Sequence, residues 1–368
     1  MSTLPKILVT SAGGKTGMRV TLQLLEKGAR VRAFVRRQDH RADLLKSAGA
    51  DIFVGNQYSL SDLRAAMKGV QRAYQCAPTA PNGLHFNAAF TAAAYDAKLE
   101  HVVTLGQWLS SVDHPSLFTR EVYISDVLIG MRAEMSVTTV IPGWFADNYL
   151  MVLDMAAHLG LLAMPLGNGE IKKNAPPSNE DIARVAVAAL IDPETHAGNS
   201  YRPTGPALLS PNDIAAAMGR ALGRRVSYRE ISEKMMLKAL KAMPPSNYSE
   251  AAVSQLAIYA DEYRRGAFAV NAPTDVVAEI GGQAPEDFTS IVRRTIAARS
   301  DLGRSAARTL GALGGFAKML LTRPPNLALI EANRDFVQIA APRFTQDDVA
   351  WTQTHAANPK TKSSKKAA

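Results

Sequence analysis

The chain alternates between short apolar runs and longer stretches in which apolar positions recur at helical spacing. Strand-length apolar runs lie at residues 6–10, 30–35, 51–55, 72–77, 101–105 and 137–141. The stretches between them, such as 59–68 and the alanine-rich 84–98, predict helices. Strands recur at intervals of about thirty residues, which is typical of right-handed parallel units. The pattern therefore predicts an α/β fold with a doubly wound, Rossmann-type parallel sheet.

The turn after the first strand carries the most informative motif. Ser11, Gly14 and Gly17 match a Gly-x-x-Gly-x-x-Gly dinucleotide-binding motif, with serine in place of the first glycine. Small residues are needed because backbone N–H groups approach a phosphate closely, next to the positive end of a helix. The residues predicted to hold the pyrophosphate are Thr10, Ser11, Gly13, Gly14, Lys15, Thr16 and Gly17. The alternative is an ordinary strand–turn–helix, and the serine has no explanation at this level.

Gly14-Lys15-Thr16 also resembles the end of a phosphate-binding P-loop. That motif needs a glycine five residues before Gly14, where this chain has Val9 inside the predicted strand. The dinucleotide interpretation is therefore preferred.

Two arginines follow the second predicted strand. The corresponding strand end in a dinucleotide fold reaches the adenine ribose, where a carboxylate binds the 2′-hydroxyl of NAD and arginine accommodates the 2′-phosphate of NADP. Here Arg36 and Arg37 come first, and no acidic residue appears before Asp39. The sequence predicts NADP(H) in preference to NAD(H). The alternative is a pair of solvated surface arginines.

Composition narrows the function classes. The 368 residues are 47% hydrophobic, which is ordinary for a globular protein with a buried core. Part of the net charge of +9 lies in the lysine-rich last nine residues, and no nucleic-acid-binding motif accompanies it, so no specific nucleic-acid partner is expected. The single cysteine, Cys76, excludes an internal disulfide, and the scattered histidines predict no metal site. No signal peptide or transmembrane segment is recognisable, so we expect a cytoplasmic protein.

Several segments together carry a family resemblance. They are 6–17, 31–37, 59–69, 101–106, 142–145 with Asn148, 179–183, 210–224 and 273–288. In their order and spacing they resemble the NmrA-like group of atypical short-chain dehydrogenases/reductases. The resemblance implies a Rossmann-type fold that binds NADP(H) or NAD(H). Members of this group include reductases of quinones, azo dyes and triphenylmethane dyes, and also NADP(H) sensors that regulate a protein partner without turnover.

The expected domain organisation has three parts. An NAD(P)-binding domain over residues 1–150 is joined by returning segments near 165–205, and a smaller helical region over 206–300 covers the substrate cleft. Residues 301–368 form an extension that ends in a basic tail, which we expect to be disordered. Ligands bind at the carboxyl ends of parallel strands. The residues therefore expected near the cofactor are Ala77, Pro78, Thr104 and Pro142.

The proton-donating pair of conventional short-chain dehydrogenases is absent. Those enzymes use a tyrosine with a lysine four residues later, whereas here Tyr123 is followed by Val127. This absence argues against alcohol–ketone interconversion, but a quinone or dye needs little acid assistance to accept hydride. Gln107, Trp108 and Tyr123 are the candidates to line the pocket, although each could serve packing instead.

Two functions remain open from the sequence. One is an NADPH-dependent oxidoreductase acting on a small aromatic or quinone-like acceptor, and the other is a non-catalytic NADP(H)-binding regulator with a protein partner. The missing tyrosine–lysine pair favours the regulator. Bulky residues of the helical region suit either a pocket lid, which favours the enzyme, or a core: Met235, Met236, Met243, Tyr248 and Tyr259.

The extension contains an apolar segment at 306–321 with helical character. It includes Arg308 and Lys318 and ends before Pro324 and Pro325. Such a helix could cover a groove, a partner in a homodimer or a membrane surface. We favour a helix that packs on its own domain, because an apolar stripe usually faces a core.

Overall fold

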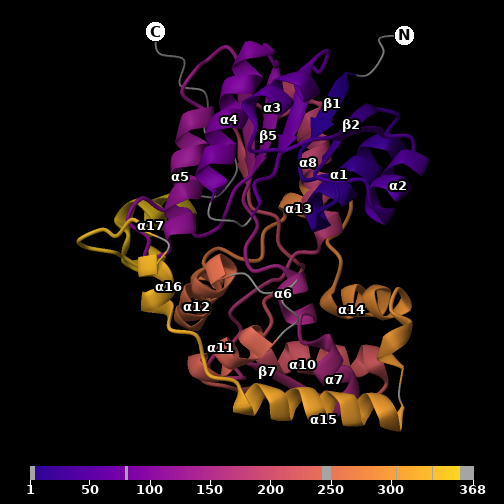
Figure 1. The fold of residues 1–368 in the computed structure, drawn as a ribbon, viewed down its shortest axis with the longest axis vertical. Helices are drawn as coiled ribbons and strands as arrows, with labels where there is room; N and C mark the ends of the chain where they lie inside the picture. Colours follow the sequence, from indigo (N-terminus) through magenta and orange to yellow (C-terminus); the bar gives the residue numbers. More distant parts are fainter. Residues whose placement is uncertain (1–4, 79–81, 243–249, 304, 334, 357–368) are drawn as a thin grey trace.

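The fold is built around a parallel sheet at the N-terminal end of the molecule (Figure 1). The computed structural model describes residues 5–78, 82–242, 250–303, 305–333 and 335–356. Within them, seven strands form this sheet in the order β3 (Asp51–Val54), β2 (Arg30–Val35), β1 (Lys6–Val9), β4 (Arg72–Gln75), β5 (His101–Leu105), β6 (Ser136–Val140), β8 (Ser200–Tyr201). The strand order reverses between β1 and β4, which is where such sheets bind dinucleotides. The predicted Rossmann-type class is confirmed.

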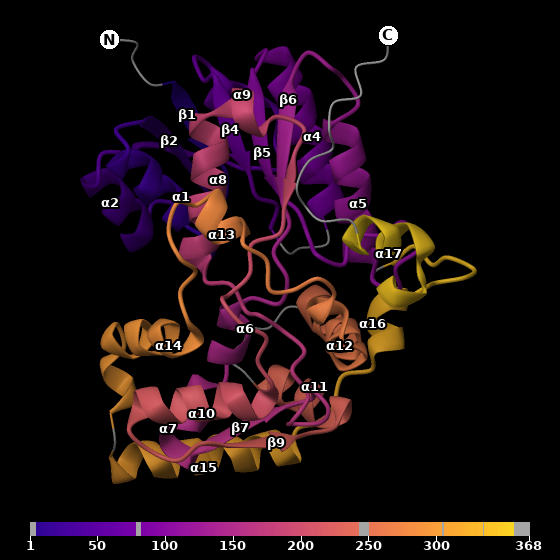
Figure 2. The same ribbon diagram turned by 180° about the vertical axis from the view of Figure 1, so that it is seen from behind.

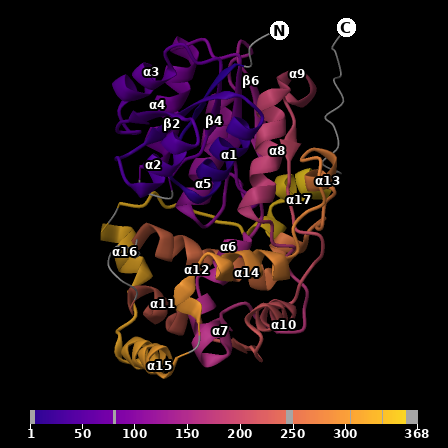
Figure 3. The same ribbon diagram turned by 90° about the vertical axis from the view of Figure 1, so that its right-hand side faces the viewer.

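Alternation along the strands places a core on each face of the sheet. In β1, Ile7 and Val9 join the core beneath one layer of helices, while Leu8 joins the core on the opposite face. The first layer contains α1 (Lys15–Glu26), α2 (His40–Ser47), α8 (Asn179–Ile191) and α13 (Val276–Glu279). The second contains α3 (Leu60–Met67), α4 (Gly83–Asp96) and α5 (Leu117–Ile129). Figure 3 shows the two layers on either side of the strands.

The segment near 165–205 returns to this sheet. Helix α8 packs against α1, and β8 pairs with β6 at Thr139 and Val140. Between them lies the short α9 (Pro193–His196). Ser178 begins α8 by accepting a hydrogen bond from the backbone N–H of Asp181. This return places the start of α8 beside the glycine-rich loop.

A second, mostly helical lobe lies below the carboxyl ends of the strands (Figure 2). Its elements are α6 (Ala146–Leu150), α7 (Leu153–Leu159), β7 (Leu161–Met164), α10 (Pro211–Leu222), β9 (Ser227–Glu230), α11 (Glu233–Ala242), α12 (Glu250–Arg265), η2 (Ala267–Ala269), α14 (Phe288–Ala297) and η3 (Ser300–Leu302). The parallel pair β7–β9 was not predicted. An aromatic core that includes Trp108, Trp144, Tyr149 and Phe268 joins this lobe to the loops of the sheet. The predicted boundaries at 150, 205 and 300 remain a proposal.

The extension after residue 300 wraps back over the molecule. It contains α15 (Ala306–Leu321), α16 (Leu327–Asn333), η4 (Thr345–Asp347) and α17 (Val349–Ala356). One face of α15 packs on α7 and α11, as favoured from the sequence. Farther on, the indole N–H of Trp351 donates to the carbonyl of Trp108 at 2.9 Å, and the Ser111 hydroxyl donates to Asp348 at 2.5 Å. The basic tail predicted to be disordered lies outside the described residues.

Two negative findings concern the described part of the chain only. None of its helices is both long and apolar enough to cross a membrane. Its His, Cys, Asp and Glu side chains form no group of three that could hold a metal ion.

Candidate functional site

The glycine-rich loop turns sharply at Ser11. This residue has a φ of 49°, the left-handed region that glycine adopts most easily. Its carbonyl accepts the Gly14 N–H at 2.7 Å, and its hydroxyl donates to the Cys76 carbonyl at 2.9 Å. The side-chain hydrogen bond ties the loop to the end of β4 and offsets the backbone strain. The serine that the sequence left unexplained therefore does what a glycine would do, with an added tether.

Two of the glycines are required by close backbone approach. A Cβ on Gly17 would lie 2.4 Å from the Ser11 carbonyl oxygen, and one on Gly14 would lie 3.0 Å from the same atom. A Cβ on Gly13 would meet only the Arg41 side chain, at 3.9 Å. No side chain caps the start of α1 at Gly14. The uncapped N–H groups and the bare loop before them fit an anionic group such as a pyrophosphate.

The other residues predicted in this loop support it. Thr10 is buried, and its hydroxyl accepts the Cys76 N–H at 2.9 Å and donates to the Tyr74 carbonyl at 3.1 Å. Thr16 is also buried and lies 3.7 Å from the Cys76 sulfur. Lys15 is exposed and forms an ion pair with Asp147 of α6 at 2.8 Å, which connects the loop to the second lobe. Thr10 and Thr16 therefore contact other residues inside the protein, whereas the exposed Lys15 bridges the loop and the second lobe.

An arginine cluster occupies the corner beyond β2. Arg36 and Arg37 are exposed, and Arg37 lies 3.3 Å from Asp39. Asp39 caps α2 and pairs with Arg41 at 2.7 Å, and the hydrogen bonds from Arg41 hold the pKa of Asp39 well below its usual range. Arg41 also donates to the Gly13 carbonyl at 3.2 Å. Asp39 is therefore fully engaged by cations, which leaves the corner positive.

Arg41 was missed from the sequence. It is the second residue of α2, and it reaches the loop only because the start of α2 packs close to Gly13. A third arginine near Arg36 and Arg37 was the only signal available.

A cavity of about 250 Å³ lies at the carboxyl ends of β4, β5 and β6. The predicted residues Ala77, Pro78, Gln107, Trp108 and Pro142 all line it. The second lobe contributes residues that close its far side: Trp144, Phe145, Asn148, Gln255, Tyr259 and Phe268. The structure therefore brings together in one wall residues that are far apart in the sequence.

The cavity wall contains polar atoms without partners. Among the described residues, neither the side-chain oxygen of Gln107 nor the indole N–H of Trp144 has a hydrogen-bond partner. The buried hydroxyl of Thr104, the residue before the last of β5, also has none within the described chain, although Thr104 does not line this cavity. Buried polar groups are normally paired, so unpaired ones in a cavity wall indicate a place for a ligand. Trp108 differs, because its indole N–H donates to the Ala267 carbonyl at 2.9 Å.

Tyr123 does not line the cavity, contrary to its choice as a pocket candidate. Tyr123 is 39% exposed, and the nearby residues Ile124 and Val127 are 43% and 50% exposed. Helix α5 turns Phe118, Glu121 and Val122 toward the cavity instead. The helical spacing puts residue 123 on the solvent side.

A carboxyl group that the sequence analysis overlooked lies in the cavity wall. Glu121 is half-buried, and burial raises its pKa to about 7. Its backbone carbonyl accepts from Ser125, whose hydroxyl also accepts from Asn87 at 2.6 Å. Burial likewise raises the pKa of Asp126 to about 7. A lone glutamate on a helix gives no sequence signal, because only tertiary packing desolvates it.

The bulky residues that the sequence assigned to either a pocket lid or a core do not all lie at the cavity. Tyr259 lines the cavity, whereas Met236 lines a small apolar cavity of about 60 Å³ that shares Trp144 and Asn148 with it. Met235 lies in the first turn of α11 and is half-buried. Met243 and Tyr248 lie outside the described residues.

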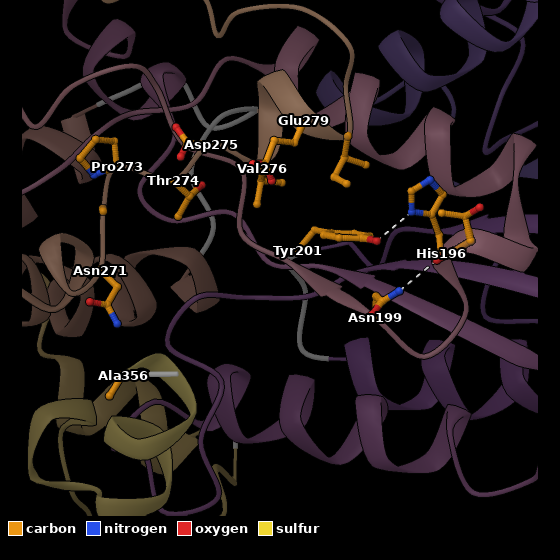
Figure 4. Close-up of a pocket in the computed structure, with 13 residues that line it drawn as sticks. His196, Asn199, Tyr201, Asn271, Pro273, Thr274, Asp275, Val276, Glu279 and Ala356 are labelled. Carbon is orange, nitrogen blue, oxygen red and sulfur yellow. Dashed lines mark hydrogen bonds between the residues drawn. The ribbon is translucent and has the colours of Figure 1, made fainter. Parts of the chain in front are cut away.

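A larger cavity of about 540 Å³ lies beside the edge strand β8 (Figure 4). His196 and Tyr201 face it and are joined by a hydrogen bond of 2.7 Å. Asp275 and Glu279 lie on the opposite wall. None of the predicted site residues contributes to this cavity, so size alone does not identify the site.

Comparison with known proteins matches the chain to one family. Residues 4–277 match the model of the NmrA-like family. The NAD(P)H azoreductase of Xenophilus azovorans is 29% identical over 293 residues, which cover 79% of this chain and 98% of that protein. Quinone oxidoreductase 2 of Escherichia coli is 24% identical over 64% of this chain and 82% of its own length.

Solved structures share the fold. The quinone oxidoreductase 2 of Escherichia coli in complex with NADPH has a TM-score of 0.66 at 20% identity, covering 79% of this chain and 99% of that one. The negative transcriptional regulator NmrA in complex with NADP has a TM-score of 0.65 at 17% identity, covering 81% and 97%. Both matches leave about a fifth of this chain uncovered.

Proposed function

Because this chain belongs to the NmrA-like family, we propose that it is an NADPH-dependent oxidoreductase that reduces a small electron-poor acceptor, such as a quinone or an azo or triphenylmethane dye. The observation that carries the proposal is the position of the 250 Å³ cavity. It lies at the ends of β4, β5 and β6, and its lining residue Ala77 follows Cys76, whose carbonyl accepts a hydrogen bond from Ser11 of the glycine-rich loop. A dinucleotide lying across the switch point would extend into it.

The chain's own groups would hold the cofactor along this path. The uncapped start of α1 binds the pyrophosphate, and Ser11 fixes the turn that exposes it. Arg36, Arg37 and Arg41 surround the 2′-phosphate, because Asp39 is already neutralised as a helix cap. Ala77, Pro78 and Pro142 line the cavity and would form the walls beside the nicotinamide. The arginine cluster supports NADP(H) over NAD(H).

Bound NADPH supplies a hydride to an acceptor held in the cavity. Trp108, Trp144 and Phe268 exclude water and offer aromatic faces to a flat acceptor. The unpaired indole N–H of Trp144 can donate a hydrogen bond to an oxygen or nitrogen of the electron acceptor and so orient it, whereas the unpaired amide oxygen of Gln107 can accept one from an N–H or O–H of a bound ligand. Glu121, which is largely neutral below pH 7, donates the proton that a quinone or an azo group takes up together with the hydride. In this arrangement Glu121 supplies the proton, so the absent tyrosine–lysine pair is not needed.

The alternative function is a non-catalytic NADP(H)-binding regulator, which the structural likeness to NmrA supports. The test is NADPH oxidation by the full chain with a panel of quinones, azo dyes and triphenylmethane dyes. We expect saturable, acceptor-dependent oxidation. Tight NADPH binding without oxidation by any acceptor would favour the regulator and overturn the enzyme.

A further inference from the structure

Helix α15 exposes a second apolar stripe on the side opposite its packing face. Met319 is buried toward α7 and α11, and Lys238 of α11 donates to the Leu320 carbonyl at 2.7 Å. The outer side presents leucines of which 44–86% is exposed: Leu310, Leu313, Leu320 and Leu321. These positions recur at helical spacing, so they form one continuous stripe. Contiguous exposed apolar surface of this kind usually marks an interaction site.

The chain segment that carries this stripe has charges of one sign. From residue 302 to 330 the sequence has no acidic residue, and it contains Arg304, Arg308, Lys318 and Arg323. Arg308, Lys318 and Arg323 are exposed. Figures 1 and 2 show α15 lying lengthwise along the end of the molecule opposite the sheet. No other described element covers its outer side.

We propose that α15 docks the protein in the plane of an anionic membrane surface. The leucine stripe would enter the boundary between headgroups and acyl chains, while the basic side chains contact the lipid phosphates. A second copy of this chain fits less well. A symmetric dimer through the stripe would place the same cations of both copies together with no acidic residue of the segment to pair with them. The proposal is independent of the catalytic one, because α15 lies outside the matched residues 4–277.

The test is sedimentation of the full chain with vesicles. We expect binding to phosphatidylcholine vesicles that contain about a quarter phosphatidylglycerol, little binding to pure phosphatidylcholine, and weakening by added salt. Replacing Leu310, Leu313 and Leu321 by glutamine should weaken vesicle binding by roughly tenfold or more. The matched control, Leu44→Gln with Val54→Gln, changes exposed apolar residues near the sheet and should leave binding unchanged.

A second variant tests the charges. Lys318→Gln with Arg323→Gln should weaken binding to anionic vesicles and reduce its salt dependence. Absence of vesicle binding, or equal binding by the leucine variant and the parent, would overturn the proposal. A concentration-dependent dimer that the leucine variant abolishes, without vesicle binding, would overturn it in favour of a second copy.

Discussion

Gly17→Ala is the most informative single change in the glycine-rich loop. The new Cβ would lie 2.4 Å from the Ser11 carbonyl oxygen, well inside the 3.4 Å at which ordinary contact begins. The next nearest atoms are also backbone atoms of Ser11 and Ala12, so no flexible side chain can give way. The loop itself must move, and with it the carbonyl that holds the Gly14 N–H at 2.7 Å.

The expected magnitudes follow from this overlap. Overpacking costs about 1–3 kcal/mol, and the better helix propensity of alanine returns about 1 kcal/mol, so the free energy of unfolding should fall by about 0–2 kcal/mol. Displacing the loop should remove one or two charge-assisted hydrogen bonds to the pyrophosphate, and the affinity for NADPH should therefore fall by roughly 10- to 100-fold.

Gly13→Ala is the matched control, because its Cβ would meet only the Arg41 side chain at 3.9 Å. It should change the free energy of unfolding by no more than about 0.5 kcal/mol. Denaturant unfolding and NADPH titration measure both effects. Equal NADPH affinity for Gly17→Ala and the parent, or an equal loss in both variants, would refute the assignment of this loop.

Three further changes test other parts of the account. Arg36→Ala with Arg37→Ala should weaken NADPH binding by roughly tenfold or more and leave NADH binding unchanged. Arg30→Ala, at the other end of β2, should affect the binding of neither cofactor. Equal weakening of NADPH and NADH binding by the double variant would contradict the 2′-phosphate assignment. The reduction rate should fall as pH rises through about 7, because Glu121 loses its proton there, and Glu121→Gln should remove that decline. Folding raises the pKa of this carboxyl, so the folded protein binds the proton more tightly, and the free energy of unfolding should decrease as the pH rises from about 5 to 7. The decrease should be smaller in Glu121→Gln, in which the raised pKa of Asp126 still contributes. Trp351→Ala should lower the free energy of unfolding by about 3–5 kcal/mol, because Trp351 is 4% exposed and its indole N–H donates to the carbonyl of Trp108 in the cavity wall. An unchanged denaturant unfolding curve would show that the C-terminal extension does not stabilise this wall.

The sequence predicted the sheet well, because its strands carry strong local signals. The apolar runs at 30–35 and 101–105 coincide with β2 and β5, and α3 lies within the helix predicted at 59–68. The sequence did not predict the strand pair β7–β9, because β9 has the sequence Ser-Tyr-Arg-Glu and none of its residues is fully buried. Its pairing depends on tertiary contact rather than on a local pattern.

The site was predicted where it is local and missed where it is not. The loop from Ser11 to Gly17 is contiguous, so its glycine spacing was visible, although the left-handed turn at Ser11 was not. Arg41 and Glu121 reach the site from different helices, and packing alone reveals them. Tyr123 was chosen by its spacing in other dehydrogenases, but the rotation of α5 turns it to solvent.

The central claim is that the cavity holds a reduced nicotinamide in one orientation beside an acceptor. The most direct measurement is a single-turnover reaction with NADPH that carries deuterium on either face of C4, using the fastest acceptor of the panel. We predict that only one of the two labels slows the reaction and leaves the cofactor, because the walls at Pro78 and Pro142 fix which face meets the acceptor. Equal behaviour of the two labels would contradict a positioned hydride transfer.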